Sequence, residues 1–279
     1  MKYNGLRFIV GSGCNLNCFY CHHEGYTGKE QLSYDQAKLN QIKDFCVNNN
    51  IYDIAITGGE PFVYHENLFM LLNTFNENDF KITLNTNAVL IDKYIHELKT
   101  YDEIEFHINF SSLNSEIHKT IVGQESLNKI KNNLSLLKDT NHKICLNIAA
   151  IKGMNEHELV DIFNYAIENS FVPRFLVLMT DDKSKMLNEQ EILSKFPGAK
   201  ILKKHSYGLM DIEYNNIFFQ VVKCLCIDLE CDICKDNTYM HITPEMNIKY
   251  CMLNDDSIGI DFNKIENSFE EAKKRLKLI

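Results

Sequence analysis

Three cysteines near the N-terminus carry the strongest chemical signal in this 279-residue sequence. Cys14, Cys18 and Cys21 follow a C-x3-C-x2-C spacing. Thiolates are the usual ligands of a [4Fe–4S] cluster, which normally takes four of them. Three ligands would leave one iron open to bind a small molecule, so the spacing predicts a reaction centre. The alternatives are a zinc site, for which His22 and His23 stand close by, or a disulfide; zinc sites usually show paired C-x2-C units or regularly spaced histidines.

A second motif, Gly58-Gly59-Glu60, directly follows an apolar segment predicted to be a strand. Glycine lets the backbone approach a ligand closely, and a carboxylate accepts hydrogen bonds from an ammonium group. On its own, a Gly-Gly pair is more often a simple tight turn. Together with the cysteine spacing, however, the motif resembles the radical S-adenosylmethionine (SAM) superfamily. The resemblance implies that the open iron and Gly58, Gly59 and Glu60 bind SAM, and that its cleavage gives a 5′-deoxyadenosyl radical that abstracts hydrogen from a substrate.

Over roughly residues 5 to 180 the chain resembles one family in particular, the GTP cyclase of molybdenum-cofactor biosynthesis. Five segments that carry this resemblance follow one another in order: Leu6-Arg7-Phe8, Ile56 to Pro61, Leu84 to Asn87, Asn147 to Asn155 and Arg174 to Met179. By position, the resemblance implies that Tyr20 lies near the SAM adenine and that Thr86 and Asn109 lie near its methionine or ribose. It also implies that Arg174 and Met179 line the SAM pocket. Ordinary core packing is the alternative for Tyr20 and Met179.

Five of the ten cysteines fall late in the chain: Cys224, Cys226, Cys231, Cys234 and Cys251. The last three resemble the C-terminal cluster region of the cyclase, which implies a second, auxiliary [4Fe–4S] cluster as metal ligands there. Cys224 and Cys226 are candidate catalytic residues. Either could close that cluster, as in the related twitch or SPASM extensions, or donate a hydrogen atom to a substrate radical. A structural zinc site and free thiols are the alternatives.

The chain departs from the cyclase where that family holds the GTP phosphates. Arginines follow the C-x2-C pair in the cyclase, but here the sequence reads Lys235-Asp236-Asn237-Thr238. Arg7 is kept and could still meet an anion. We therefore expect the SAM half of the family, with a peptide substrate in natural-product (RiPP) maturation; the alternative is a MoaA-like reaction of a nucleotide or sugar-like metabolite. A metal-stabilised binding protein on a degenerate barrel is disfavoured by the intact cysteines and Glu60.

Strand-like and helix-like segments alternate along the first 180 residues. The predicted strands span residues 6–10, 53–57, 81–85, 103–110, 143–151 and 174–179. Six β/α units predict a partial (β/α)6 TIM-like barrel, with its chemistry at the carboxyl ends of the strands. Ser33 and Asn155 are predicted to cap helices near residues 33–48 and 156–169. His22, His23 and Glu24 either tune the cluster or contact substrate, or simply form a polar loop at the barrel mouth.

Residues 1–180 are predicted to form the barrel, and residues 181–279 a small cysteine-rich extension with β-hairpin character over 200–219. No apolar run approaches the roughly 20 residues of a membrane span, and no signal peptide is evident, which predicts a cytoplasmic protein. The net charge of −9 argues against a nucleic-acid partner. An external electron donor such as flavodoxin or ferredoxin is expected.

Overall fold

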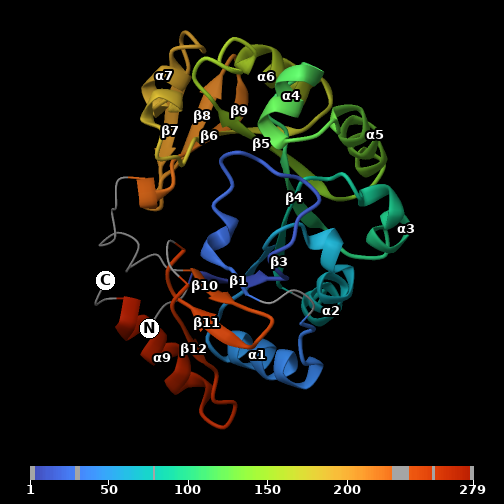
Figure 1. Cartoon of the computed structure of the whole chain (residues 1–279), viewed down its shortest axis with the longest axis vertical. Coiled ribbons are helices and arrows are strands. Elements are labelled where there is room, and N and C mark those ends of the chain that lie inside the picture. Colours follow the sequence, from blue (N-terminus) through green and yellow to red (C-terminus); the bar gives the residue numbers. More distant parts are fainter. Residues whose placement is uncertain (1–3, 29–31, 78, 228–238, 253–254, 277–279) are drawn as a thin grey trace.

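The computed structural model describes residues 4–28, 32–77, 79–227, 239–252 and 255–276. Its strands join in one sheet, in the order β12-β11-β10-β1-β2-β3-β4-β5-β6-β9-β8-β7. Figure 1 shows these strands curving around a central space, with the helices on the outside. The predicted fold class, an open α/β barrel, is confirmed.

The six predicted barrel strands are all present, each within two residues of its predicted range. They pair in parallel in chain order, as the predicted repeat requires. Along β4, Ile104, Phe106 and Ile108 are buried, whereas the alternate residues are only partly buried. The apolar face packs under the helices and the polar face lines the barrel interior. The strands are β1 (Gly5–Ile9), β2 (Asp53–Thr57), β3 (Lys81–Thr86), β4 (Ile104–Asn109), β5 (Lys143–Ala150) and β6 (Val172–Val177).

Two later strands lengthen the parallel part of the sheet. β9 (Ile217–Val222) pairs in parallel with β6, and β10 (Tyr239–Ile242) pairs in parallel with β1. The outer strands are antiparallel: β7 (Lys200–Lys204), β8 (Leu209–Tyr214), β11 (Asn247–Lys249) and β12 (Ser257–Gly259). The hairpin predicted over residues 200–219 is confirmed. Because the sheet continues past residue 180, the barrel wall includes strands from both sides of the predicted boundary, and the division into two domains remains a prediction.

The helices cover the outer face of the sheet. They are α1 (Gln36–Asn48), α2 (His65–Phe75), α3 (Ile95–Leu98), α4 (Ser115–Val122), α5 (Leu127–Lys138), α6 (Leu159–Glu168), α7 (Glu189–Leu193) and α9 (Ile265–Leu276). Phe45 of α1 stacks on Phe269 of α9 with ring centroids 4.2 Å apart, so the last described helix packs on the first. The sequence did not predict α4, which Asn114 caps by accepting from two backbone N–H groups. Among the described helices, none has the length and apolar character to cross a membrane.

Two predicted helix caps are wrong. α1 begins after Asp35, whose carboxylate accepts from the backbone N–H groups of Ala37 and Lys38, so Ser33 is not the cap. α6 begins after Glu158, and Asn155 is instead fully buried. The Asn155 side chain accepts from the Ile151 N–H and donates to the carbonyls of Ser111 and Ala149, so it satisfies backbone groups at the end of β5 and just after β4.

Candidate active site

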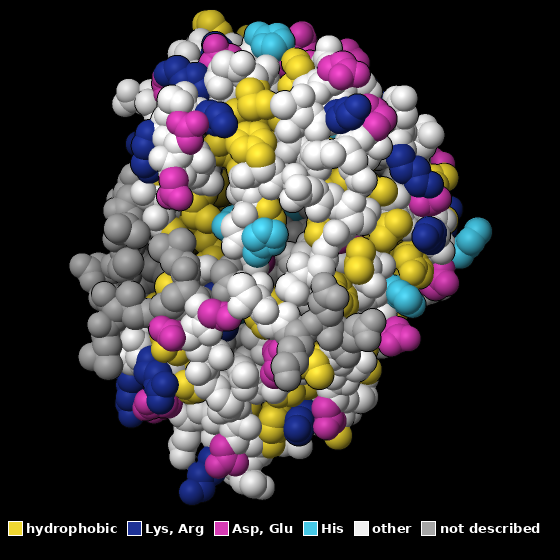
Figure 2. All heavy atoms as spheres, viewed as in Figure 1, with side chains coloured by type: hydrophobic (Ala, Val, Ile, Leu, Met, Phe, Trp, Pro, Cys, Tyr) yellow, Lys and Arg dark blue, Asp and Glu magenta, His cyan; other side chains and the backbone are white. Residues whose placement is uncertain are grey.

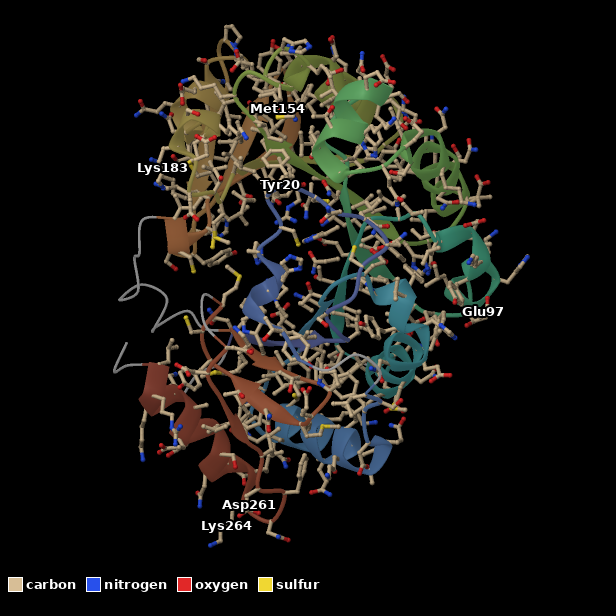
Figure 3. The ribbon with its side chains drawn as sticks, in the orientation of Figure 1. Tyr20, Glu97, Met154, Lys183, Asp261 and Lys264 are labelled. Carbon is tan, nitrogen blue, oxygen red and sulfur yellow. The ribbon has the colours of Figure 1, made fainter. Side chains whose placement is uncertain are left out.

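The three N-terminal cysteines line one interior cavity of about 190 Å³. The same cavity is lined by the Gly58-Gly59-Glu60 motif and by polar residues from the ends of β3, β4 and β5. Figure 2 shows a hollow near the centre of this face of the molecule, beside histidine side chains. In Figure 3, Tyr20 of the cysteine loop lies inside the ring of strands, whereas Glu97 and Lys264 lie at the periphery. The cavity is therefore at the predicted end of the barrel.

The cysteine thiols have the surroundings expected of metal ligands. Cys14 Sγ accepts from the Leu16 N–H at 3.4 Å and from Asn87 Nδ2 at 3.6 Å. Asn109 Nδ2 donates to Cys18 Sγ at 3.8 Å. Burial, together with the charges of the other two thiolates, raises the pKa of Cys18 to about 12. Three mutually repelling thiolates in one cavity become favourable when they share a cationic centre, so this donor set fits a three-cysteine cluster.

The glycine motif and the cysteine loop are joined through their backbones. Gly59 N–H donates to the Gly11 carbonyl at 2.8 Å, and Glu60 N–H donates to the Gly13 carbonyl at 2.9 Å. A Cβ on Gly59 would lie 1.9 Å from the Gly13 carbonyl oxygen. Only glycine allows this approach, so the motif is more than a tight turn: it fixes the position of the loop that carries Cys14.

The Glu60 side chain is 1% exposed and joins the ends of two strands. Its carboxylate accepts from Thr86 Oγ1 at 2.6 Å, from the Asn87 N–H at 2.8 Å and from the Phe62 N–H at 3.2 Å. Burial raises the pKa of Glu60 to about 7, against the effect of these hydrogen bonds. The predicted residues Glu60 and Thr86 thus contact each other at the cavity wall.

Tyr20 and Asn109 also contact each other. The Tyr20 hydroxyl donates to Asn109 Oδ1 at 3.1 Å, and the same asparagine contacts Cys18. Met179 lies with Tyr20 in an adjoining cleft of about 510 Å³, which Cys226 also lines. Cys21 lies on both the cavity and this cleft, so the structure brings a candidate catalytic cysteine close to the cluster loop.

A group of charges joins β1, β10 and the short helical turn at residues 23–25 that follows the cysteine loop. The Arg7 guanidinium is 3.3 Å from Glu24 Oε2, and Thr57 Oγ1 donates to Glu24 Oε1 at 2.9 Å. Glu24 has a φ of 53°, an uncommon conformation that turns its carboxylate inward. Although burial opposes it, the charge of Arg7 and neighbouring histidines lower the pKa of Glu24 to about 2. Burial, followed by the charge of Arg7, lowers the pKa of His241 to about 3, which keeps it neutral.

The second cysteine group is described only in part. Cys231 and Cys234 lie outside the described residues. Cys251 directly follows Tyr250 after β11 and is partly exposed, and Lys249 Nζ donates to its carbonyl. A hydrogen bond with Cys226 lowers the pKa of Cys224 to about 7, and the charge of Arg7 acts in the same direction. Cys224 therefore lies near the charged group on β1.

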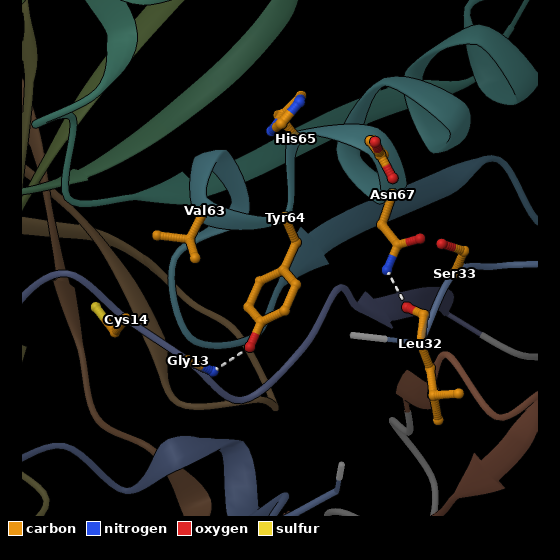
Figure 4. Close-up of a pocket in the computed structure, with 9 residues that line it drawn as sticks. Gly13, Cys14, Leu32, Ser33, Val63, Tyr64, His65 and Asn67 are labelled. Carbon is orange, nitrogen blue, oxygen red and sulfur yellow. Dashed lines mark hydrogen bonds between the residues drawn. The ribbon is translucent and has the colours of Figure 1, made fainter. Parts of the chain in front are cut away.

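A separate pocket of about 610 Å³ lies on the other side of Cys14 (Figure 4). Tyr64 forms part of its wall, and the Gly13 N–H donates to the Tyr64 hydroxyl at 2.7 Å. A Cβ on Gly11 would lie 2.4 Å from the Tyr64 ring, so glycine is required there as well. Tyr64 therefore supports the cysteine loop through its hydrogen bond with the Gly13 N–H.

The family model described as "Radical SAM superfamily" matches residues 8–166. The chain belongs to the radical SAM superfamily. It is 26% identical to a GTP 3′,8-cyclase of Aliarcobacter butzleri over 99% of this chain and 90% of that one. A probable GTP 3′,8-cyclase of Methanothermobacter thermautotrophicus is 23% identical over 91% and 85% of the two chains.

Solved radical SAM structures share the fold. Streptococcus suis SuiB bound to S-adenosylmethionine superposes with a TM-score of 0.67 and 15% identity over 94% of this chain. This chain spans only 64% of SuiB. Native anSMEcpe with bound AdoMet gives a TM-score of 0.61 and 12% identity over 98% of this chain and 82% of that one. Superfamily membership implies a [4Fe–4S] cluster and SAM, and the cysteine loop fits that requirement.

Sequence reasoning missed His107, which lines the cavity, and considered Glu24 only as part of a polar loop. It also missed Glu105, Gln220 and Asp211, which are joined to His107 and Arg174 by hydrogen bonds. A signal for two of them is present in β4, where Glu105, His107 and Asn109 alternate with buried apolar residues. In a barrel strand, such alternation places polar side chains inside.

Proposed function

We propose that this radical SAM enzyme acts on a peptide, in the maturation of a ribosomally made natural product. The observation that carries the proposal is the pairing of Arg7 on β1 with Glu24. A triphosphate requires several available cations, but Arg7 is already paired with Glu24 and His241 is neutral. The sequence departure at residues 235–238 agrees with this. A peptide needs fewer fixed charges in its binding site.

A cluster held by Cys14, Cys18 and Cys21 would supply the electron that cleaves SAM to methionine and a 5′-deoxyadenosyl radical. The chain's own residues bind and orient. Glu60 has used three of its roughly four acceptor positions. One position is left for the amino group of SAM beside Gly58 and Gly59. Tyr20 and Asn109 would contact the rest of SAM and keep water from the cavity.

The late cysteines are proposed to serve the second half of the reaction. Cys231, Cys234 and Cys251 would hold an auxiliary cluster that accepts an electron. Cys224 or Cys226 would either complete it or donate a hydrogen atom to the substrate radical. The position of Cys226 in the cleft beside Cys21 and Met179 supports access of this thiol to a substrate.

A nucleotide or sugar-like metabolite is the second candidate, and the similarity to GTP 3′,8-cyclases along most of the chain favours it. The two candidates are separated by assaying 5′-deoxyadenosine from anaerobically reconstituted, dithionite-reduced protein. The assay is run with SAM alone, with GTP, and with a short precursor peptide encoded next to the gene. We expect the peptide to stimulate cleavage at least tenfold and to change mass. Stimulation by GTP with a cyclised product would support the second candidate, and no cleavage at all would overturn both.

A further inference from the structure

Arg174 of β6 is held by three neutral partners. Its NH1 group donates to His107 Nδ1 at 2.7 Å and to Asn147 Oδ1 at 2.9 Å. Its Nε donates to Gln220 Oε1 at 2.9 Å. A guanidinium has five N–H groups, so the two on NH2 remain, and no partner for them occurs among the described residues. His107 and Asn147 both line the cysteine cavity, so two of the three partners of Arg174 are cavity residues.

Each of two carboxylates is separated from Arg174 by one of these neutral groups. Because His107 Nδ1 accepts from Arg174, its proton is on Nε2, which lies 2.7 Å from Glu105 Oε1. On the other side, Gln220 Nε2 donates to Asp211 Oδ1 at 3.0 Å. Within the described part of the chain, no carboxylate lies within 4.0 Å of the Arg174 guanidinium.

The strand register makes this arrangement possible. Asn109 and Asn147 are direct partners between β4 and β5, and Asn147 and Arg174 are partners between β5 and β6. The row continues through Gln220 on β9 and Asp211 on β8. One of the three hydrogen-bond partners of Arg174, Gln220, therefore comes from a strand after residue 180.

A metal site at Glu105, His107 and Cys145 is the competing explanation, because their ligand atoms lie within 4.8 Å of one another. The hydrogen bonds argue against it. The His107 nitrogen that faces Glu105 carries a proton, and Lys143 Nζ lies 2.7 Å from Glu105 Oε2. Arg174 and Lys143 together would repel a divalent cation.

We propose that His107 and Gln220 are positioning residues that orient Arg174 and keep its charge available for one carboxylate group in the cavity. A directly paired carboxylate would compensate the charge of Arg174. Neutral partners such as His107 and Gln220 instead fix the orientation of the guanidinium and leave its charge for a ligand. The carboxylate belongs either to SAM or to the substrate. This inference rests on the proposed function only for the identity of that ligand.

The sharpest test moves one negative charge from Asp211 to its hydrogen-bonded neighbour Gln220, which contacts Arg174 directly. In the double variant Gln220→Glu/Asp211→Asn, a carboxylate accepts directly from Arg174 Nε, and residue 211 donates to it in return. The number of hydrogen bonds is unchanged, and only the charge is relocated. Asp211→Asn alone is the matched control. His107→Asn keeps an acceptor near Nδ1 and should retain binding, whereas His107→Leu removes it.

Binding is measured on the reconstituted protein by calorimetry with S-adenosylhomocysteine and with 5′-methylthioadenosine, which lacks the carboxylate. Saturation-transfer NMR of acetate reports a carboxylate site independent of SAM. We expect the double variant to lose about tenfold in affinity for a carboxylate ligand and none for 5′-methylthioadenosine. Loss for S-adenosylhomocysteine assigns the site to SAM, and loss for acetate alone assigns it to the substrate.

The proposal is overturned if neither carboxylate ligand is affected, or if 5′-methylthioadenosine weakens equally, which would indicate a purely structural role. Circular dichroism melting checks that each variant folds. None of these measurements requires SAM cleavage. A negative result would therefore leave the proposed function standing, and failure of cleavage would leave this inference testable.

Discussion

Two arginines face the barrel interior, and the structure surrounds them in opposite ways. Arg7 on β1 has a carboxylate directly beside it, with Glu24 Oε2 at 3.3 Å. Among the described residues, the hydrogen bonds of Arg174 on β6 go to a histidine, an asparagine and a glutamine, with the carboxylates one group further away. The charge of Arg7 is largely compensated, whereas that of Arg174 is oriented and available. Within the described part of the chain this leaves one available cation, which suits a ligand with one anionic group better than a polyphosphate.

The largest effect is expected from removing the three N-terminal cysteines. The triple variant Cys14/Cys18/Cys21→Ala should abolish 5′-deoxyadenosine formation, because the cluster that binds SAM is lost. Iron per chain after anaerobic reconstitution should fall from about eight to about four. A fall from about four to none would instead mean a single cluster, with the late cysteines as zinc ligands or free thiols. Retained cleavage activity would contradict the site altogether.

Both the Arg174 side and the Arg7 side should lose stability as the pH falls, each through one buried histidine. Burial lowers the pKa of His107 to about 4, and an unfolded histidine titrates near 6.5. The folded chain therefore holds His107 neutral, and its stability falls as the pH drops through 6.5, because unfolding takes up a proton. His107→Asn should reduce the loss of unfolding free energy between pH 7 and pH 5 by about 1 kcal/mol.

His241 on the β1 side acts in the same window, since its pKa is lowered to about 3. Glu24 does not, because its pKa of about 2 confines its contribution to the range below its ordinary value of 4.5. Denaturant unfolding at the two pH values for wild type, His107→Asn and His241→Asn would separate the two histidines. If His107→Asn loses as much unfolding free energy between pH 7 and pH 5 as the wild type, the folded chain does not hold the His107 side chain neutral.

A smaller effect tests the pairing of Arg7. Glu24→Gln keeps the shape of the side chain and an acceptor for Thr57 but removes the charge that compensates Arg7. We expect inorganic triphosphate to bind about tenfold more tightly to this variant, which corresponds to about 1.4 kcal/mol. Calorimetry measures it, with Glu66→Gln on the exposed start of α2 as the control. Equal triphosphate affinity in wild type and Glu24→Gln would show that Glu24 does not restrict Arg7.

The smallest effect is expected at Tyr64, which supports the cysteine loop away from both arginines. Tyr64→Phe removes the acceptor of the Gly13 N–H and should lower the free energy of unfolding by about 1 kcal/mol. Chemical denaturation measures the loss, and binding of acetate should be unchanged. A change in acetate binding would mean that the cysteine loop and Arg174 on β6 are coupled, which would weaken the contrast between Arg7 and Arg174.

The sequence was informative where the signal is local. The ligand set Cys14, Cys18 and Cys21 lies in one short loop, and six β/α units were recognisable because burial periodicity is set residue by residue. The helix caps were wrong for Ser33 and Asn155, because a polar side chain near a helix start can equally bond to other backbone. For Asn155 the tertiary partners, Ser111 and Ala149, decided the outcome.

Residue type and spacing by themselves determined the cluster loop, the glycine motif and the parallel strand order. Only the tertiary structure decided which charges meet inside the barrel. Glu24 reaches Arg7 through an unusual backbone conformation, and Gln220 reaches Arg174 because β9 pairs in parallel with β6. Neither contact can be read from the sequence, since each depends on the register between strands that are distant in the chain. The energy of a buried charge depends on such neighbours within a few ångströms, so the chemistry available to each arginine was settled by packing.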